Sequence, residues 1–384
     1  MKRILNIFLL LSLVTNLSAQ ANVDSVDAKV NRISKALQIL REFRLVAYSQ
    51  VQFQRADTIG AKSYAGGDFP AQTDNRFAVR RGRLKISFDH EGKKGFRVFQ
   101  STFQIDATEK GFQLRDFYGR VIDPWTGWVG LQAGFMDRPF GYEVTTGDDT
   151  RETPERARMS QIVFPSEKDL GTSLVIESPK TFKPVYLRLD AGAFNGTGSV
   201  SSFTKRKDFI GRLQARKTFK LNEKMNFVLS GGASYYYGGV LQSTPVVYTL
   251  ANDANGILKY TKATDSSAVN KKFYKREYYG VELQAGIDYP IGTTTVRGEF
   301  IGGIQPGINN ALTVPTALGS DLYIRKFNGA YFYFVQTIKQ KIKDHTIYHD
   351  FVFKYDFLNP NTQIAQKDLS TTNDSKVSAA DIGY

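Results

Sequence analysis

Along most of this chain apolar and polar residues alternate one by one, and this alternation restricts the fold more than any other feature. In residues 45–54, for example, Leu45, Val51 and Phe53 share one side, and Gln50 and Gln52 share the other. Such alternation places the two kinds of side chain on opposite faces of a β-strand. It predicts about thirteen strands, at 45–54, 77–89, 96–107, 116–121, 129–135, 170–178, 184–194, 208–218, 226–238, 277–289, 294–303, 327–340 and 346–357.

Two kinds of protein have strands of this type, and the connections distinguish them. A soluble sandwich turns its apolar faces toward each other, whereas a transmembrane barrel turns them toward lipid and its polar faces toward a lumen. Here long polar connections, at 55–75, 137–169, 195–207, 239–276, 304–326 and 358–380, alternate with short turns. Outer-membrane barrels have long loops on one rim and short turns on the other. The sequence therefore predicts an all-β fold, a transmembrane antiparallel β-barrel.

The N-terminal residues have the layout of a cleaved signal peptide. A basic start, Lys2-Arg3, precedes an apolar run from Ile4 to Val14, and small residues follow near position 20. The run is shorter than the roughly 20 apolar residues of a membrane helix. We therefore expect residues 1–20 to direct export and to be removed. Loss of Lys2 and Arg3 lowers the formal net charge from +14 by two, and the absence of cysteine excludes a disulfide framework.

Residues 23–42 are predicted to form an amphipathic helix. Apolar residues recur at alternating spacings of three and four, at Val23, Val26, Val30, Ile33 and Leu37, which is a heptad pattern. A helix of this length is marginal alone and needs a partner. That partner is either the body of the same chain or a second subunit in a short coiled coil. Residues 43–384 are expected to form the barrel.

Several predicted strands turn cations toward the lumen. By alternation these are Arg81, Arg83, Lys85, Arg120, Arg188, Arg212 and Arg216, followed by Arg297 and Lys354. Arginine and lysine ladders are how pores select anions, and the guanidinium fork matches the oxygens of phosphate. The alternative is that each arginine pairs with a lumenal acid such as Asp116, Asp190, Glu282 or Glu299. For Arg297 beside Glu299 we favour that pairing.

The connection 137–169 is an irregular, highly charged insert that begins with the rigid sequence Arg138-Pro139-Phe140-Gly141. Long irregular inserts in regular structure are commonly functional. Catalytic motifs are not evident, since the three histidines lack the spacing of metal ligands. The pair Asp148-Asp149 is expected to be solvated. We predict no enzyme activity, no metal, no cofactor and no nucleic-acid partner.

From about Leu40 onward the chain resembles the phosphate-selective porin family, the O/P porins. The resemblance rests on the order and spacing of several segments. They include LREFRLVAYSQVQFQ at 40–54, FAVRRGRLKISF at 77–88, LRDFYGRV at 114–121, VGLQAGFMDRPFGYE at 129–143, KDFIGRLQAR at 207–216 and FVFKYDFLNPN at 351–361. The most distinctive piece is the PFG-x-E element before the long charged connection.

This resemblance implies a trimeric barrel of 16 strands in the lipid of a Gram-negative outer membrane, passing small anions by diffusion. It implies that connection 137–169 folds into the lumen as the constriction, contributing Arg138, Arg156 and Arg158. Arg80, Arg81, Arg83 and Arg212 match basic motifs of the family. The same connection, however, holds five cations and eight acids. That excess of acid suits a phosphate filter only if the acids point away from the passage.

Only 13 to 14 of the implied 16 strands are evident, since the last residues, Asp381 to Tyr384, just enter a fourteenth. Single-chain bacterial barrels close with an even number of strands. We therefore expect closing strands beyond this sequence, with a complete smaller barrel as the alternative. For function we predict passive diffusion of small anions, with phosphate or a similar oxyanion as the candidate. The alternatives are a non-selective porin and a surface-binding barrel that transports nothing.

Overall fold

The computed structural model describes residues 32, 34, 37, 39–63, 65–179, 182, 185–199, 205–241, 246–264, 273–308, 312, 321–364 and 376–384. The chain divides into two compact units, Met1–Phe43 and Arg44–Tyr384. In the first, residues 32, 34, 37 and 39–42 are helical. The rest of the helix expected at 23–42 and the signal peptide expected at 1–20 lie outside the described residues. The fold discussed from here on is that of the second unit.

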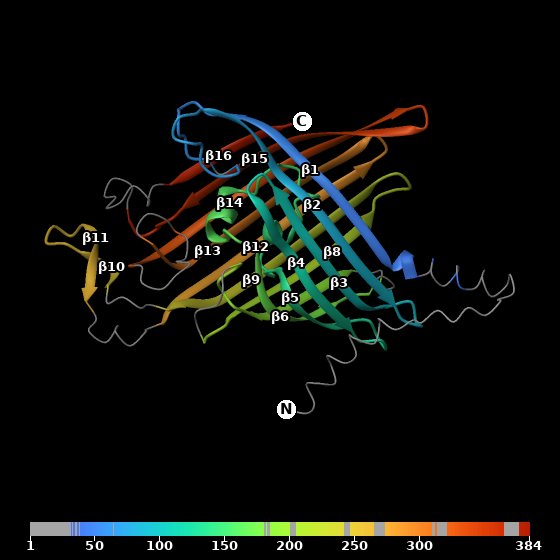
Figure 1. Cartoon of the computed structure of the whole chain (residues 1–384), viewed down its shortest axis with the longest axis horizontal. Coiled ribbons are helices and arrows are strands. Elements are labelled where there is room, and N and C mark those ends of the chain that lie inside the picture. Colours follow the sequence, from blue (N-terminus) through green and yellow to red (C-terminus); the bar gives the residue numbers. More distant parts are fainter. Residues whose placement is uncertain are drawn as a thin grey trace. The chain divides into compact units, whose positions relative to one another are not determined.

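This unit is an all-β, antiparallel barrel fold, and fourteen of the sixteen strands in its described residues pair in chain order (Figure 1). They are β1 (Phe43–Arg55), β2 (Asn75–Glu91), β3 (Arg97–Thr108), β4 (Gly111–Ile122), β5 (Val129–Asp137), β6 (Lys168–Glu177), β7 (Tyr186–Phe194), β8 (Asp208–Lys220), β9 (Asn226–Leu241), β12 (Phe273–Tyr289), β13 (Gly292–Gly307), β14 (Leu322–Ile342), β15 (His345–Asn359) and β16 (Val377–Gly383). All thirteen predicted strands are present, and β16 is the fourteenth.

The remaining two strands form a hairpin that the sequence analysis missed. β10 (Val246–Asn252) and β11 (Leu258–Thr264) pair with each other inside the connection between β9 and β12. Val247 and Tyr248 of β10 also run parallel to the first residues of β14. The connection predicted at 239–276 is therefore long, as expected, but contains two strands that were not predicted. An Asp-Ala-Asn-Gly turn between segments rich in Val, Thr and Tyr was the available signal.

The two faces of the sheet differ as the alternation predicts. Phe117 and Leu131 are exposed on the outer face, while their neighbours Arg120 and Gln132 point inward and are buried or half-buried. Exposed apolar side chains of this kind recur on nearly every strand. Contiguous apolar surface of this extent is rare on soluble monomers and matches the outer band of a membrane barrel. Among the described residues, no helix is long and apolar enough to span a membrane.

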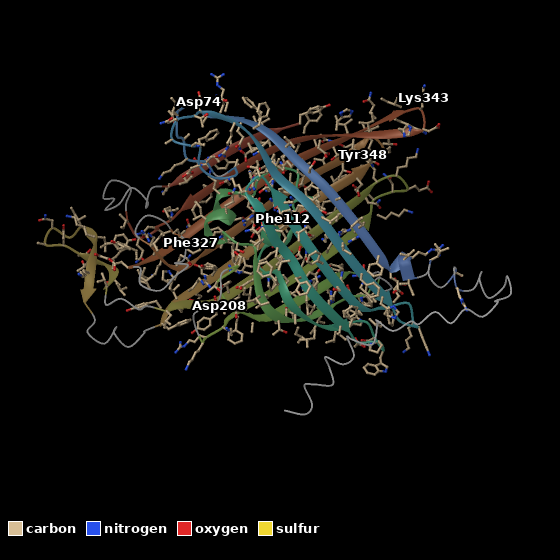
Figure 2. The ribbon with its side chains drawn as sticks, viewed as in Figure 1. Asp74, Phe112, Asp208, Phe327, Lys343 and Tyr348 are labelled. Atoms are coloured by element: carbon tan, nitrogen blue, oxygen red, sulfur yellow. The ribbon has the colours of Figure 1, made fainter. Side chains whose placement is uncertain are left out.

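The strands end at two different rims. Figure 2 shows Asp74 and Lys343 at opposite ends of the strands. Asp74 belongs to the long connection between β1 and β2, and Lys343 to the two-residue turn between β14 and β15. We refer to these ends as the long-loop rim and the short-turn rim.

Candidate functional site

The connection between β5 and β6, residues 138–167, lies inside the barrel. It contains two short helices, α3 (Tyr142–Thr145) and α4 (Arg158–Val163), in place of the irregular insert that the sequence suggested. Asp148 pairs with Arg83 of β2, and Glu152 pairs with Arg297 of β13. Helix α4 contacts β14 and β15. Since strands far apart in the sheet all contact this one loop, the sheet curves around it (Figure 1).

Apolar packing attaches the loop to one half of the wall. Phe140 and Phe164 are fully buried, and their ring centroids are 5.1 Å apart. The ring of Phe164 also lies 6.0 Å from Tyr236 of β9 and 5.7 Å from Tyr278 of β12. Burial of each phenylalanine contributes about 2–3 kcal/mol. This cluster holds the loop against β9 and β12–β15.

Two buried glutamates hold helix α3 in place through hydrogen bonds. The carboxylate of Glu143 accepts hydrogen bonds from the backbone N–H of Ala157 (2.9 Å) and the hydroxyl groups of Ser160 (2.5 Å) and Tyr333 (2.9 Å). Glu299 of β13 accepts the N–H groups of Tyr142 and Glu143. Gly141 has φ 62°, and a Cβ atom there would collide with the Glu299 carboxylate. The PFG-x-E element thus sets the direction in which the loop enters the lumen.

The acids of the loop face arginines of the wall. We define the arm as residues 146–156, which contain no helix or strand. Within it, Asp148 pairs with Arg83 and lies 3.2 Å from Arg81 Nε, and Glu155 pairs with Arg80 and Arg81. The expectation that Asp148 is solvated is wrong, because its side chain is buried among these guanidinium groups; Asp149 is exposed.

Two loop carboxylates have lowered pKa values for this reason. Burial alone would raise the pKa of Asp148, but the charges of Arg151, Arg83 and Arg81 outweigh burial and hold it well below its usual range. At Glu167 burial also raises the pKa of the carboxyl group, but the charges of Arg156 and Arg115 outweigh burial and lower that pKa to about 2. Both carboxylates therefore stabilise the folded loop only while they are ionised.

This predicts a loop that loosens in acid. A lowered pKa in the folded state contributes stability that is complete above the ordinary carboxyl pKa of about 4 and is lost as the pH falls from there through the lowered pKa, which is about 2 for Glu167. We expect constant single-channel conductance between neutral pH and about pH 5, and altered, noisier conductance as the pH falls to about 2, where Glu167 of the folded loop becomes protonated. The double variant Asp148→Asn/Glu167→Gln should show the altered conductance already at neutral pH. Identical traces of the wild type at neutral and acidic pH would contradict the prediction.

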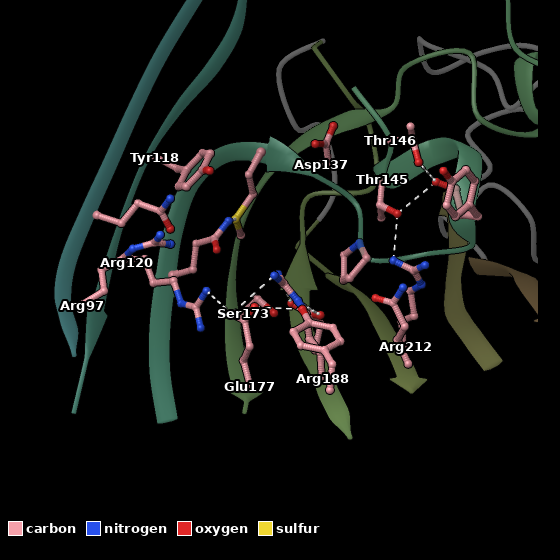
Figure 3. A pocket seen from close by; sticks show the side chains of 18 residues that line it. Arg97, Tyr118, Arg120, Asp137, Thr145, Thr146, Ser173, Glu177, Arg188 and Arg212 are labelled. Atoms are coloured by element: carbon pink, nitrogen blue, oxygen red, sulfur yellow. Dashed lines mark hydrogen bonds and ion pairs between the residues drawn. The ribbon is translucent and has the colours of Figure 1, made fainter. Parts of the chain in front are cut away.

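A polar cavity of about 390 Å³ lies between α3 and the wall formed by β3–β8. Figure 3 shows Arg97, Arg120, Arg188 and Arg212 along this wall, with Thr145 of α3 opposite. Arg120 donates to Glu177 (2.8 Å), and Arg188 donates to Asp190 (2.7 Å). Arg212 donates to the hydroxyl of Thr145 (2.8 Å) and pairs with Glu282. We call this cavity the passage.

The sequence analysis overlooked Arg97. If the strand were regular, the side chain of Arg97 would point outward, as that of Phe99 does. The pairing of β2 with β3 shifts register at His90/Glu91, where Phe99 pairs with His90 but Arg97 pairs with Glu91. One extra residue in a strand reverses the direction of every side chain beyond it. Arg97 therefore lines the passage, and only the cross-strand register reveals it.

The other predicted site residues fall in separate places. Arg120, Arg188 and Arg212 line the passage, whereas Arg80, Arg81 and Arg83 meet the arm. Arg138 pairs with Asp169 of β6 (3.4 Å), and Arg156 pairs with Glu167 within the loop (2.8 Å). Arg158 lines a smaller cavity beside β15 and β16. Lys85 of β2 is half-buried, and Arg216 of β8 is exposed.

The pairing expected between Arg297 and Glu299 is wrong in detail. Arg297 pairs with Glu152 of the arm at 2.9 Å, and its Nε donates to Gln284. Glu299 instead accepts hydrogen bonds from α3 and Tyr331. The pairs expected to involve Asp190 and Glu282 do form, with Arg188 and Arg212. In the described part of the chain, no group of three His, Asp or Glu side chains is arranged to hold a metal ion.

Comparisons with known proteins find distant structural neighbours. No family model and no curated protein matches the sequence. Pseudomonas putida OprB aligns with TM-score 0.48 and 10% identity over 86% of this chain and 78% of its own. Vibrio cholerae OmpT, an outer membrane protein in a trimer form, aligns with TM-score 0.39 and 10% identity over 82% of each chain. A Rh. blastica porin mutant aligns with TM-score 0.30 and 12% identity over 82% of this chain and 99% of its own. At these values no family is assigned.

Proposed function

We propose that this chain is an outer-membrane channel through which small hydrophilic solutes, with a preference for small anions, diffuse passively. The observation that carries the proposal is the passage, a polar cavity inside a barrel whose outer face is apolar. Such a molecule places its apolar band in lipid and offers water a route through the lumen. Export by residues 1–20 and assembly as a homotrimer belong to the same proposal.

The preference for anions is supported by the lining of the passage. Four arginines reach it, Arg97, Arg120, Arg188 and Arg212, against three acids, Asp137, Glu177 and Asp190. The side chains of Arg97 and Arg188 are 33% and 30% exposed, although Arg97 pairs with Asp89 and Arg188 with Asp190 and Glu177. Cations that bind an anion weakly at several successive positions favour conduction, because the ion enters one position and leaves for the next.

The pairing of the loop acids supports an oxyanion such as phosphate as a candidate solute. Asp148, Glu152, Glu155 and Glu167 all form ion pairs with arginines. Their charges are therefore neutralised at the attachment of the loop, and the acid-rich composition of the loop does not make the passage acidic. Membership of the phosphate-selective porin family remains part of this proposal.

Selectivity in planar bilayers tests the proposal. In a potassium chloride gradient we expect the reversal potential of the wild type to show anion preference. In Arg97→Gln/Arg188→Gln the ratio of anion to cation permeability should fall about fivefold, since a unit charge about 4 Å from an ion in water contributes about 1 kcal/mol. Lys217→Gln is the matched control, because Lys217 lies on the opposite side of β8 from Arg212 and is exposed.

The possible outcomes separate the alternatives. No conductance would contradict the channel and favour a surface-binding barrel. Conductance without anion preference would support a non-selective porin. Equal permeability ratios in the double variant and the wild type would show that Arg97 and Arg188 do not determine selectivity.

A further inference from the structure

A second cavity, of about 430 Å³, lies at the short-turn rim. Its walls come from the three turns that join β2 to β3, β4 to β5 and β6 to β7, and from the strand ends beside them. Four residues line both this cavity and the passage, namely Arg97, Arg120, Glu177 and Tyr186. Figure 3 shows the first three of them on one wall. The cavity therefore adjoins the passage at its short-turn end, and we call it the vestibule.

One side of the vestibule is aromatic, in contrast to the polar passage. Phe96 and Phe182 line it, together with Ile122 and Tyr186. The side chain of Phe182 is 40% exposed, and its ring meets that of Trp128 edge-on, with 5.2 Å between the centroids. Aromatic rings bind one another in offset or edge-on arrangements, so Phe182 has surface left for a further ring. The vestibule can therefore hold a ligand that carries an aromatic ring.

The turns hold these aromatic walls in place. The carboxylate of Asp123 accepts hydrogen bonds from four backbone N–H groups of the turn between β4 and β5. Gly127 of that turn has φ 72°, and a Cβ atom there would collide with the ring of Phe96. In the turn between β6 and β7, the N–H of Phe182 donates to the carbonyl oxygen of Pro179 (2.8 Å). A site that is formed before its ligand arrives loses less entropy on binding.

The lining of the vestibule carries both signs of charge in equal number. Among the described residues that line it, Arg97 and Arg120 are balanced by Glu91 and Glu177. Arg120 donates to Glu177 (2.8 Å), so these two charges neutralise each other. Since recognition of a charged ligand requires a complementary potential, a lining without net charge favours neither a simple anion nor a simple cation.

The other two charged groups have hydrogen-bonding capacity left for a ligand. Arg97 lies 3.4 Å from Asp89 but donates no hydrogen bond to any described residue, and Glu91 forms no ion pair within the described part of the chain. Glu91 and Arg97 are partners across β2 and β3. One guanidinium group and one carboxylate are therefore presented together at the vestibule. A ligand whose anionic and cationic groups lie close together can pair with both.

We propose that the vestibule is a binding site for a free aromatic amino acid in its zwitterionic form. The ring of the ligand packs against Phe96 and Phe182. Its carboxylate binds Arg97, and its ammonium group binds Glu91. The volume of the vestibule falls within the range of about 300–1,000 Å³ that is usual for small-molecule pockets. The inference deepens the proposed function by naming a solute for the mouth of the passage, and it rests on that function only for the route by which the solute passes.

Binding of L-phenylalanine to the detergent-solubilised full chain at neutral pH tests the inference. Titrations are followed by saturation-transfer NMR, with detergent micelles alone as the blank. We expect Phe182→Ala to bind about tenfold more weakly than the wild type, because the ligand ring loses an aromatic contact. The matched control is Phe219→Ala, which should bind like the wild type. Phe219 lies at the same rim, is 38% exposed and contacts the ring of Phe227, but it does not line the vestibule.

Two analogues with the same ring test the two charges separately. 3-Phenylpropionate lacks the ammonium group and phenethylamine lacks the carboxylate, so the wild type should bind each about fivefold more weakly than L-phenylalanine. Glu91→Gln should weaken L-phenylalanine to the same extent without weakening 3-phenylpropionate. Arg97→Gln should weaken L-phenylalanine without weakening phenethylamine, because each variant removes a contact that one analogue never makes. Glu223→Gln, in an exposed turn of the same rim, is the control.

Equal binding of L-phenylalanine by Phe182→Ala and Phe219→Ala would overturn the inference. Equal binding of the three ligands by the wild type would also overturn it, because the paired charges would then have no role. If Phe182→Ala does not give a heat-modifiable, folded barrel, the comparison of the three ligands on the wild type and on Glu91→Gln decides.

The binding experiment does not depend on conduction. Charge-selective binding of L-phenylalanine by a protein that conducts no ions would retain the site and reject the channel. Conduction with anion preference but no binding of L-phenylalanine would retain the channel and reject the site. The two proposals can therefore fail separately.

Discussion

Phe164→Ala is expected to release the loop from the wall and to increase single-channel conductance. The phenyl ring is fully buried between Phe140, Tyr236 and Tyr278, and Arg138 lies over its face at 5.9 Å. Replacing a buried phenylalanine by alanine costs about 3–5 kcal/mol. The ring is therefore a major part of the attachment of the loop to the wall.

Two measurements follow the released loop. Conductance in planar bilayers reports the width of the lumen, and trypsin reports whether Arg151, Arg156 and Arg158 have become accessible. The matched control is Phe117→Ala, because Phe117 is 62% exposed on the outer face of β4 and contacts no part of the loop that we describe. A Phe164→Ala protein with unchanged conductance and a trypsin-resistant loop would refute the role of this ring.

Glu143→Ala is expected to disorder the loop to a similar extent by a different route. The carboxyl group is 1% exposed and accepts hydrogen bonds from the first residues of α4 and from Tyr333 of β14. Its removal leaves two buried donors, on Ala157 and Ser160, without an acceptor, while the hydroxyl of Tyr333 keeps that of Thr153 as a partner. Each such loss costs about 1–3 kcal/mol. Helix α4 loses its N-terminal acceptor and its link to α3 in the same step.

Hydrogen exchange of the backbone amides of α4 measures this effect. We expect faster exchange at residues 158–163 in Glu143→Ala, an intermediate rate in Glu143→Gln, which keeps one acceptor oxygen, and no change in Glu223→Ala. Glu223 lies exposed in the short turn between β8 and β9. Unchanged protection of α4 in Glu143→Ala would show that the apolar cluster alone orders the loop.

Much of the fold could be predicted because strand alternation is a local signal. In a strand such as β8 the polarity of each side chain indicates the face on which it lies. About ten residues therefore suffice to identify a strand and its lumenal side. Arg212 and Arg188 were placed on the inner face in this way and are found there. The method fails where register changes, as at Arg97, and where strands are short, as in β10 and β11.

The candidate site was harder to predict because its contacts join distant parts of the chain. The sequence shows Arg81, Arg83 and Lys85 together on one strand but not the acids that face them. Those acids, Asp148 and Glu155, come from a loop attached to the opposite wall. Helix α3 and the Glu143 contacts depend on Glu299, more than 150 residues further along the chain. No local pattern encodes such pairs.

By itself, then, the sequence determined the class of fold and the two faces of the sheet, because side-chain direction alternates with every residue. The lengths of the connections determined the long-loop rim and the short-turn rim. The tertiary structure decided where the charges act. It directed the acids of the loop toward the arginines of β2, β4 and β13, and it placed Arg97 and Arg188 in the lining of the passage. The physical reason is that an ion pair depends on distance in space, and in a barrel the residues closest across the lumen are among the most distant along the chain.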